Sequence, residues 1–109
     1  MDHTPRLALP FIMPGQAQKH ITHNEAILAL DCLVQPVVES RTVTAPPATP
    51  LAGEAWIVPA GASGVWTGHT DEIAAYAAGA WSFLDPAAGW QVYDRSDGTL
   101  LVFRSEEHT

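Results

Sequence analysis

The residues best suited to chemistry in this sequence gather at the start of its clearest helical stretch. His20 and His23 are three residues apart, and Glu25 follows them. Two histidines at this spacing lie close together on a helix and can both bind one metal ion. Further ligands would have to come from a distant set: His3, His69 and Asp71. Because histidines beside such polar neighbours more often form local hydrogen bonds, we expect no metal and no cofactor.

Acidic residues form two small clusters, Asp71-Glu72 and Asp94/Asp97. A glycosidase needs two carboxylates facing each other across a cleft, about 5–9 Å apart. Acidic residues in turns more often accept hydrogen bonds from their own backbone. The sequence also lacks a serine in a nucleophile elbow and a glycine-rich phosphate loop. Its one cysteine, Cys32, is expected to be a small buried residue. We therefore predict that the chain is not an enzyme.

Four tryptophans follow glycines at short and regular distances. Gly64-Val-Trp66 and Gly79-Ala-Trp81 repeat a G-x-W unit, in which a turn glycine precedes a large ring at the start of a strand. Trp56 and Trp81 lie in apolar segments and are expected in the core, where each ring buries roughly 150–250 Å². The alternative is an aromatic platform for sugar rings, for which the candidates are Trp66, Tyr76 and Trp90.

The composition indicates one domain that can fold and excludes several partners. The chain has 109 residues, of which 47% are hydrophobic and 16% charged, and its net charge is −7. Because no basic patch is present, we expect no nucleic-acid binding. No segment approaches the roughly 20 apolar residues of a membrane span, so we expect no membrane contact and synthesis in the cytoplasm. A surface with few charges also favours assembly with other chains.

Residues 16–34 carry the strongest helical signal. Thr22 and Glu25 have the spacing of a capping box, which predicts a helix start at Thr22, and Pro36 ends the helix. Residues 16–20 are then either an extra turn or the approach to the helix. A helical period places five apolar residues on one arc, which we expect to face the core: Ala26, Ile27, Leu30, Leu33 and Val34. Leu28 and Cys32 lie on the opposite, polar side and suggest a second contact surface, either for another subunit or for the chain's own N-terminal arm.

The segments on either side of this helix divide the chain into an arm, a domain and a tail. Residues 1–15 contain three prolines and are predicted to be an extended arm whose apolar residues need cover. With the Leu28/Cys32 pair, they form our candidate oligomer or partner interface: Leu7, Leu9, Phe11, Ile12, Leu28 and Cys32. Residues 16–104 form one domain, and residues 105–109 are a polar tail expected to fray.

Short β-branched and aromatic runs, separated by glycine and proline, predict six to seven strands. They are expected at 37–44, 56–58, 73–76, 81–84, 90–94 and 99–104, with a further short run near 65. Ala77 to Ala80 can close a hairpin, and Asp97-Gly98 predicts a two-residue hairpin turn. The fold class is α+β, with one N-terminal helix packed on a small antiparallel sheet, meander or barrel.

Two segments together resemble a known family of domains. They are LPFIMPGQAQKHITHNEAILALDCLV and TAPPATPLAGEAWIVPAGASGVWTGHTDEIAAYAAGAWSFLDPAAGW, and the resemblance runs from about Leu7 to Val102. Such domains occur in tail-fibre and spike-like proteins of phages and of gene transfer agents, which are phage-like DNA-carrying particles. Many members are fused to fibre segments, whereas this sequence stops soon after the last predicted hairpin, so we expect a stand-alone adaptor or base rather than a whole fibre. The resemblance implies a structural role and supplies no catalytic residues.

These observations lead to two hypotheses about function. In the first, the chain is an oligomeric head-spike or fibre base of a phage-like particle, which holds a fibre for host attachment. Its partners would be further copies of itself, capsid or tail proteins and a fibre protein, and it would leave the cell within the particle. A ring of such copies needs head-to-tail contacts. In the second, the chain is a carbohydrate-binding module that recognises host surface polysaccharide through exposed aromatic rings.

Overall fold

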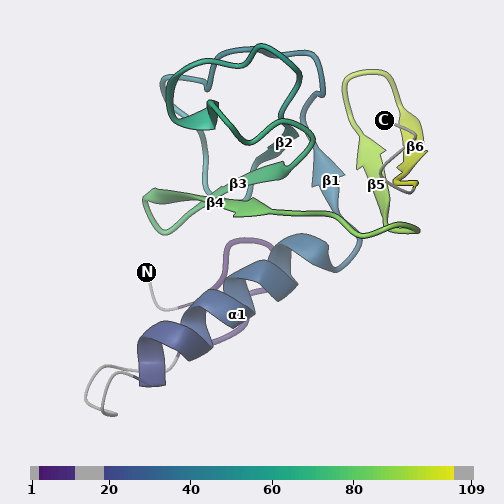
Figure 1. Ribbon diagram of the computed structural model, residues 1–109. Helices are drawn as coiled ribbons and strands as arrows, with labels where there is room; N and C mark the ends of the chain where they lie inside the picture. The colour runs from purple at the N-terminus through teal and green to yellow at the C-terminus, as the bar shows by residue number, and fades with distance from the viewer. Residues whose placement is uncertain (1–2, 12–18, 105–109) are drawn as a thin grey trace.

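The computed structural model describes residues 3–11 and 19–104, and within the helix it describes side chains from His23 onward (Figure 1). One helix precedes two sheets of three strands each, which agrees with the predicted α+β class. The described residues form no closed barrel. The elements are α1 (Lys19–Leu33), β1 (Val37–Val38), β2 (Ala55–Ile57), the 3-10 helix η1 (Gly64–Trp66), β3 (Ile73–Ala77), β4 (Ala80–Leu84), β5 (Gln91–Asp94) and β6 (Thr99–Val102).

The N-terminal boundary of α1 differs from the predicted one. Residues from Lys19 onward are already helical, so Thr22 lies inside the helix. A capping-box threonine must stand outside the helix with non-helical backbone angles. The capping-box prediction is therefore wrong, although the end of the helix before Pro36 is confirmed.

The two sheets differ in the direction of their strands. Strands β2, β3 and β4 form an antiparallel meander. Strand β5 lies between β1 and β6, pairing antiparallel with β6 but parallel with β1. The parallel pair contradicts the predicted all-antiparallel sheet. It arises because the long chain segment between β1 and β5 contains a whole sheet of its own.

Backbone hydrogen bonds after β1 join the two sheets. The N–H of Glu39 donates to Ala55 at 2.7 Å, and the N–H of Ile57 donates to Ser40 at 3.1 Å. The chain thus leaves β5 after Val38 and pairs briefly with β2. The strand predicted over 37–44 is consequently cut to two residues, and its β-branched remainder is a connection.

The two predicted hairpins close in different ways. Ala78 and Gly79, both at positive φ, form the two-residue turn between β3 and β4, as predicted. Between β5 and β6, Asp94 pairs with Thr99, and Gly98 at φ +71° donates its N–H to Asp94. Four residues, 95–98, therefore connect the two strands. The predicted two-residue Asp97-Gly98 turn is therefore wrong.

The β2–β3–β4 sheet carries a hydrophobic cluster on each face. The face toward α1 shares a cluster of buried residues with the second sheet: Cys32, Val38, Ala55, Ile57, Ile73 and Val92. The opposite face carries Trp56, Val58, Trp66 and Ala74. This alternation follows from the two-residue period of strands. The molecule therefore has three layers: α1, the sheet, and the connection that contains η1 (Figure 1).

The described part of the N-terminal arm is a tight loop against α1. The N–H of Thr4 donates to Leu9, the N–H of Ala8 donates to Thr4, and His3 forms a bridge with Pro10. The prediction of an extended arm is wrong for these residues. The buried Thr4 hydroxyl also accepts the Leu9 N–H at 2.9 Å, and this bond stabilises the loop. The remaining arm residues lie outside the described part of the chain.

Candidate functional site

The histidines considered for metal binding do not come together in the structure. The Glu72 carboxylate accepts a hydrogen bond from His69 Nδ1 at 2.7 Å, and the His69 ring stacks on Phe83 with centroids 3.6 Å apart. His23 is exposed on α1, and the side chain of His20 lies outside the described set. Among the described residues, no three His, Cys, Asp or Glu side chains are placed to hold a metal ion.

The Asp94/Asp97 cluster forms an ion network with Arg41. The guanidinium donates to the carboxylate of the fully buried Asp94 and, at 3.0 Å, to that of Asp97. Asp94 Oδ1 also accepts the N–H and hydroxyl of Ser96, while Asp97 Oδ1 accepts the N–H of Thr99. These contacts confirm that the acids stabilise their own turn, and they join the β5–β6 hairpin to the connection after β1.

The charges in this network shift the pKa values of its exposed members. Hydrogen bonds from Thr99, followed by Arg41, lower the pKa of Asp97 below its ordinary value. Hydrogen bonds to Asp97 and Asp94 raise the pKa of Arg41 above its ordinary value. Both changes favour the ionised forms. Arg41 and Asp97 therefore form a pair of opposite charges at neutral pH.

Three indole rings pack against one another on the outer face of the sheet. The Trp66 ring centroid lies 6.0 Å from that of Trp56 and 5.5 Å from that of Trp81, and Trp56 and Trp81 are also 5.5 Å apart. Trp56 is buried and Trp81 is half-buried, so their predicted core role is confirmed. Trp66 is fully buried, and within the described structure its Nε1–H has no hydrogen-bond partner.

This packing overturns the predicted sugar platform. Trp66 cannot offer its ring to a ligand, because its surface is covered by the other indoles and by the β2–β3–β4 sheet. Tyr76 packs edge-on against Trp81, with centroids 5.2 Å apart. Trp90 instead lies beside the other sheet and packs on its core. The three predicted residues therefore form no common surface.

Helix α1 is rotated about its axis relative to the predicted orientation. Cys32 is buried against the sheet, which confirms that it is a small buried residue, and Leu28 lines the interface with it. The helical period places both on the polar side of the helix. Leu30 is 53% exposed and Val34 43% exposed, although both were predicted to face the core, as was Ala26, which is also exposed. Leu33 does pack against the core, and Ile27 is half-buried. The predicted core stripe is therefore largely wrong.

Two contacts on other sides of α1 explain this rotation. The sheet face that faces α1 carries small side chains, among them Ala75 and Ala77. Ala29 and Cys32 of the helix lie against this face. The buried Asp31 is covered by the arm, whose Arg6 and Leu7 N–H groups donate to its carboxylate. With these two sides occupied, the apolar arc that contains Leu30 remains toward solvent.

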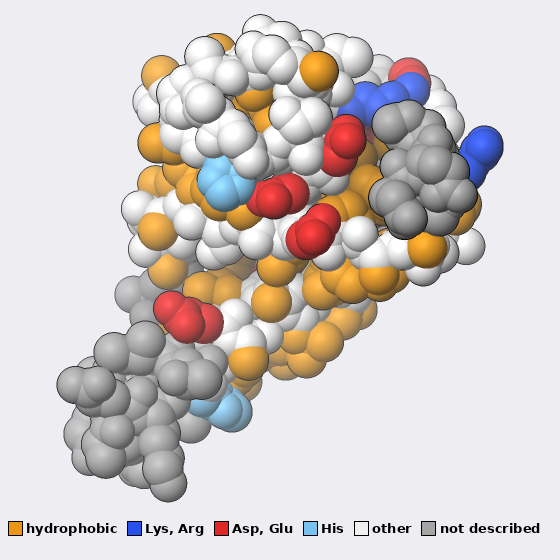
Figure 2. Space-filling view, in the orientation of Figure 1, with side chains coloured by type: hydrophobic (Ala, Val, Ile, Leu, Met, Phe, Trp, Pro, Cys, Tyr) orange, Lys and Arg blue, Asp and Glu red, His pale blue; other side chains and the backbone are white. Residues whose placement is uncertain are grey.

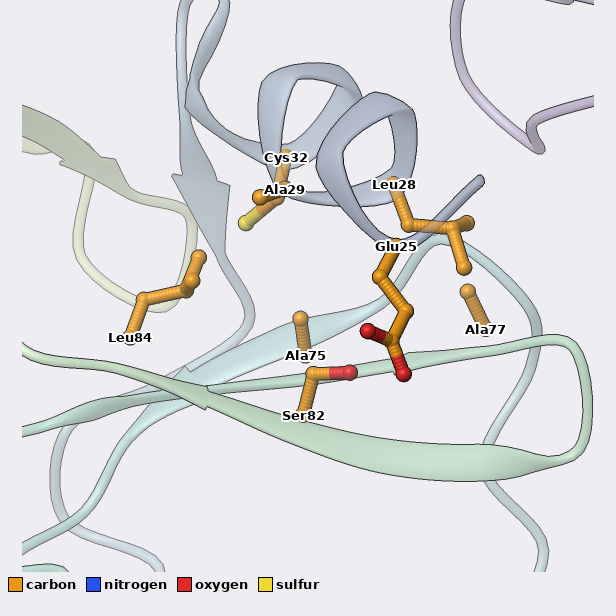
Figure 3. A pocket seen from close by; sticks show the side chains of 8 residues that line it. All are labelled: Glu25, Leu28, Ala29, Cys32, Ala75, Ala77, Ser82 and Leu84. Carbon is orange, nitrogen blue, oxygen red and sulfur yellow. The ribbon is translucent and has the colours of Figure 1, made fainter. Parts of the chain in front are cut away.

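A small cavity of about 210 Å³ lies between α1 and the sheet (Figure 3). Its wall is formed by Glu25, Leu28, Ala29, Cys32, Ala75, Ala77, Ser82 and Leu84. The Glu25 side chain extends from the helix toward Ser82 on β4 (Figure 3). Burial is the main influence on the Cys32 thiol and raises its pKa from 9.0 to about 11. The thiol therefore stays protonated and unreactive at neutral pH.

Two groups of exposed apolar side chains lie on the outward side of α1 and on the β5–β6 hairpin, while Leu51 and Val65 are exposed singly elsewhere. Figure 2 shows hydrophobic side chains along the C-terminal half of α1. On the hairpin, Leu100 is 53% exposed and Val102 52% exposed, and the neighbouring Tyr93 is also exposed. A partner could contact either group, and we call them the α1 outer face and the β6 edge.

Some of the residues predicted to form an interface are exposed, and others are covered by the chain itself. Leu7 is exposed beside α1, while Leu9 and Phe11 are half-buried. Ile12 lies outside the described residues. Leu28 and Cys32 contact the chain's own sheet, so their assignment to a subunit interface is wrong. No helix in the described part of the chain is long and apolar enough to span a membrane.

Comparison with known proteins places this architecture in a family. Residues 23–109 match the model of a family described as proteins of unknown function, DUF2793. The chain belongs to the DUF2793 family. The match begins within α1 and includes β1 to β6, so the two-sheet core lies inside the DUF2793 region and residues 3–11 precede it. No curated protein shows significant similarity to the chain.

Three residues that organise this DUF2793 chain were missed from the sequence. The motifs and periodicity of the sequence assign no role to Arg6, Asp31 or Arg41. The signal for Asp31 was its place in the middle of an apolar run, where a carboxylate requires partners. Nothing in the local sequence identifies Arg6 as that partner, since 25 residues separate the two.

Proposed function

We propose that this chain is a structural component of a phage-like, DNA-carrying particle such as a gene transfer agent. It would act there as an oligomeric head-spike or fibre base that joins a fibre to the particle. The role requires no catalytic step and no cofactor. The finished chain would leave the cell within the particle, and the partners would be copies of itself, capsid or tail proteins and the fibre.

The observation that carries this proposal is the orientation of α1. Three residues of its apolar arc, Ala26, Leu30 and Val34, are exposed in the isolated chain. A helix arc of this kind normally faces a core. Exposed apolar helix residues on a chain with few charges are expected where a neighbouring subunit covers them in an assembly. The resemblance of two long segments to spike and fibre domains supports the same role.

A polysaccharide-binding function is not proposed as a second candidate. Its central residue, Trp66, is fully buried. Tyr76 lies on β3 and packs on Trp81, whereas Trp90 lies just before β5 and packs on the cluster that the two sheets share. The rings that remain partly exposed therefore provide no flat shared surface. An aromatic sugar platform needs accessible ring faces.

The test is to follow the tagged chain in cells that encode it and to isolate released particles by density gradient. We expect the chain in the particle fraction. A Leu30→Lys/Val34→Lys variant should be lost from particles yet remain folded. Val65→Lys is the matched control, because Val65 is an exposed apolar residue on η1 and its variant should still be incorporated. Absence of the unmodified chain from every particle fraction would overturn the proposal.

A further inference from the structure

Strand β6 has one side of its backbone unpaired within the described structure. It pairs with β5 on one side and has no second neighbouring strand among the described residues. The N–H of Phe103 donates to Trp90 at 2.8 Å, so Phe103 directs its backbone groups toward β5. Because these directions alternate along an antiparallel strand, Thr99 and Leu101 also face β5. The N–H and C=O groups of Leu100 and Val102 therefore point outward.

The described edge segment from Thr99 to Phe103 contains neither a charge nor a proline, two features that commonly prevent edge pairing. Its outward backbone groups belong to Leu100 and Val102, whose side chains are also more than half exposed. Backbone chemistry and side chains thus both fit an extended apolar strand.

We propose that two copies of this chain pair through β6, antiparallel and about a twofold axis at Leu101. Leu100 of one copy would then exchange both backbone hydrogen bonds with Val102 of the other, and the reverse pair would do the same. The β1–β5–β6 sheets would join into one continuous six-stranded sheet. Leu100, Val102 and Tyr93 of both copies would cover one another on one face, because Tyr93 stands opposite Leu100.

Charge complementarity favours a second copy as the occupant. In this register Arg104 lies opposite Gly98 of the other copy and next to its Asp97. Arg104 is exposed and has no ion pair within the described structure. Asp97 is exposed, and its pKa is lowered, so it is ionised at neutral pH. Two such pairs would close the ends of the joined strands, although the chain as a whole is acidic.

Pairing through β6 would be one of the contacts between copies in the particle proposed above. It can nevertheless be tested separately from the particle role. One strand pair is a small interface, so we expect weak association and would measure sedimentation of the full chain from about 10 µM to about 1 mM. The unmodified chain should form dimers. Val102→Pro removes an outward donor at a site where an edge strand tolerates proline, and it should weaken association at least tenfold. Leu100→Lys should do the same, whereas Val65→Lys should have no effect.

Cysteine pairing tests the register directly. Directly opposed residues of this kind have Cα atoms about 5.5 Å apart, within the range that a disulfide spans. An equimolar mixture of Leu100→Cys and Val102→Cys chains should form crosslinked dimers on mild oxidation. Each variant alone should crosslink far less, because neither position 100 nor position 102 lies opposite the same position in the other chain. Cys32 is buried and contributes little background.

The possible outcomes separate the two proposals. A chain that stays monomeric to about 1 mM, or equal crosslinking in the mixture and in the single variants, overturns β6 pairing. If Leu30→Lys abolishes self-association while Val102→Pro does not, β6 pairing is overturned and the particle role stands. If β6 pairing is found but the chain is absent from particles, the particle role fails and the edge contact stands.

Discussion

Asp31 and Arg6 bind each other's backbone. The Asp31 carboxylate accepts the N–H of Arg6 at 3.0 Å, and the Arg6 guanidinium donates to the Asp31 carbonyl at 2.6 Å. The same guanidinium also reaches the carbonyls of Cys32, Val34 and Gln35. Arg6 thus satisfies carbonyls that the last turn of α1 leaves unpaired, and its positive charge suits the negative end of the helix dipole. The arm is held by its own helix.

Replacing Asp31 should therefore release the arm. Asp31→Ala leaves the N–H groups of Arg6 and Leu7 without their acceptor, and we expect a loss of about 3 kcal/mol in the free energy of unfolding. Urea denaturation followed by circular dichroism measures it. Asp71→Asn, at an exposed turn position, is the control and should change stability by less than about 0.5 kcal/mol. Equal losses in the two variants would contradict the contact.

The orientation of α1 predicts opposite effects for two neighbouring lysine substitutions. Leu30→Lys places a charge in solvent and should change monomer stability by less than about 0.5 kcal/mol. Cys32→Lys places the same charge between helix and sheet and should cost about 3 kcal/mol or more. Thermal and urea unfolding at low protein concentration would measure both. A greater loss for Leu30→Lys would mean that the helix packs as its periodicity predicts.

The Arg41 network should depend far more on one aspartate than on the other. Asp94 is fully buried, so Asp94→Ala leaves Arg41 and Ser96 without their shared acceptor and should cost about 3 kcal/mol. Asp97→Ala removes a surface contact and should cost clearly less. The comparison uses the same urea titration at pH 7. Similar losses would indicate that the two carboxylates share the ion pair equally.

Alkaline pH should destabilise the fold through Cys32. The pKa of the folded thiol is raised to about 11, against an ordinary value of 9.0, so the folded state retains a proton that the unfolded state releases. The resulting stability is fully present below pH 9 and is lost as pH rises toward 11. With a pKa difference of about 2, the loss approaches about 3 kcal/mol. Cys32→Ala should flatten this part of the pH–stability curve. An unchanged slope would contradict the burial of the thiol.

The sequence predicted the strands of the meander well, because local signals determine them. Trp56, Ile73 and Trp81 lie in runs bounded by glycine and proline, and Gly79 supplies the turn that the β3–β4 hairpin needs. The G-x-W unit is confirmed there. At Gly64 the same unit is a 3-10 helix, because Trp66 turns back over the sheet instead of entering it.

The helix orientation and the arm could not be predicted from local pattern. The periodicity of α1 identifies the most apolar arc correctly, but which arc is buried depends on the surface it meets. Here the sheet offers small side chains to Cys32, and Arg6 occupies the side of Asp31. Both partners are distant in the sequence. The sugar platform failed for a related reason, since the contacts that bury Trp66 come from β2 and β4.

The parallel pairing of β1 with β5 has a consequence for how the chain acquires its structure. Val37 aligns with Tyr93, so more than half of the sequence separates the partners, and the complete meander lies between them. Closing so long a loop slows folding relative to local hairpins. During synthesis on the ribosome, the two valines of β1 stay exposed to solvent until the β5–β6 hairpin has been synthesised and has left the exit tunnel. Chaperone dependence during synthesis should therefore be greatest before residue 94 has left the exit tunnel.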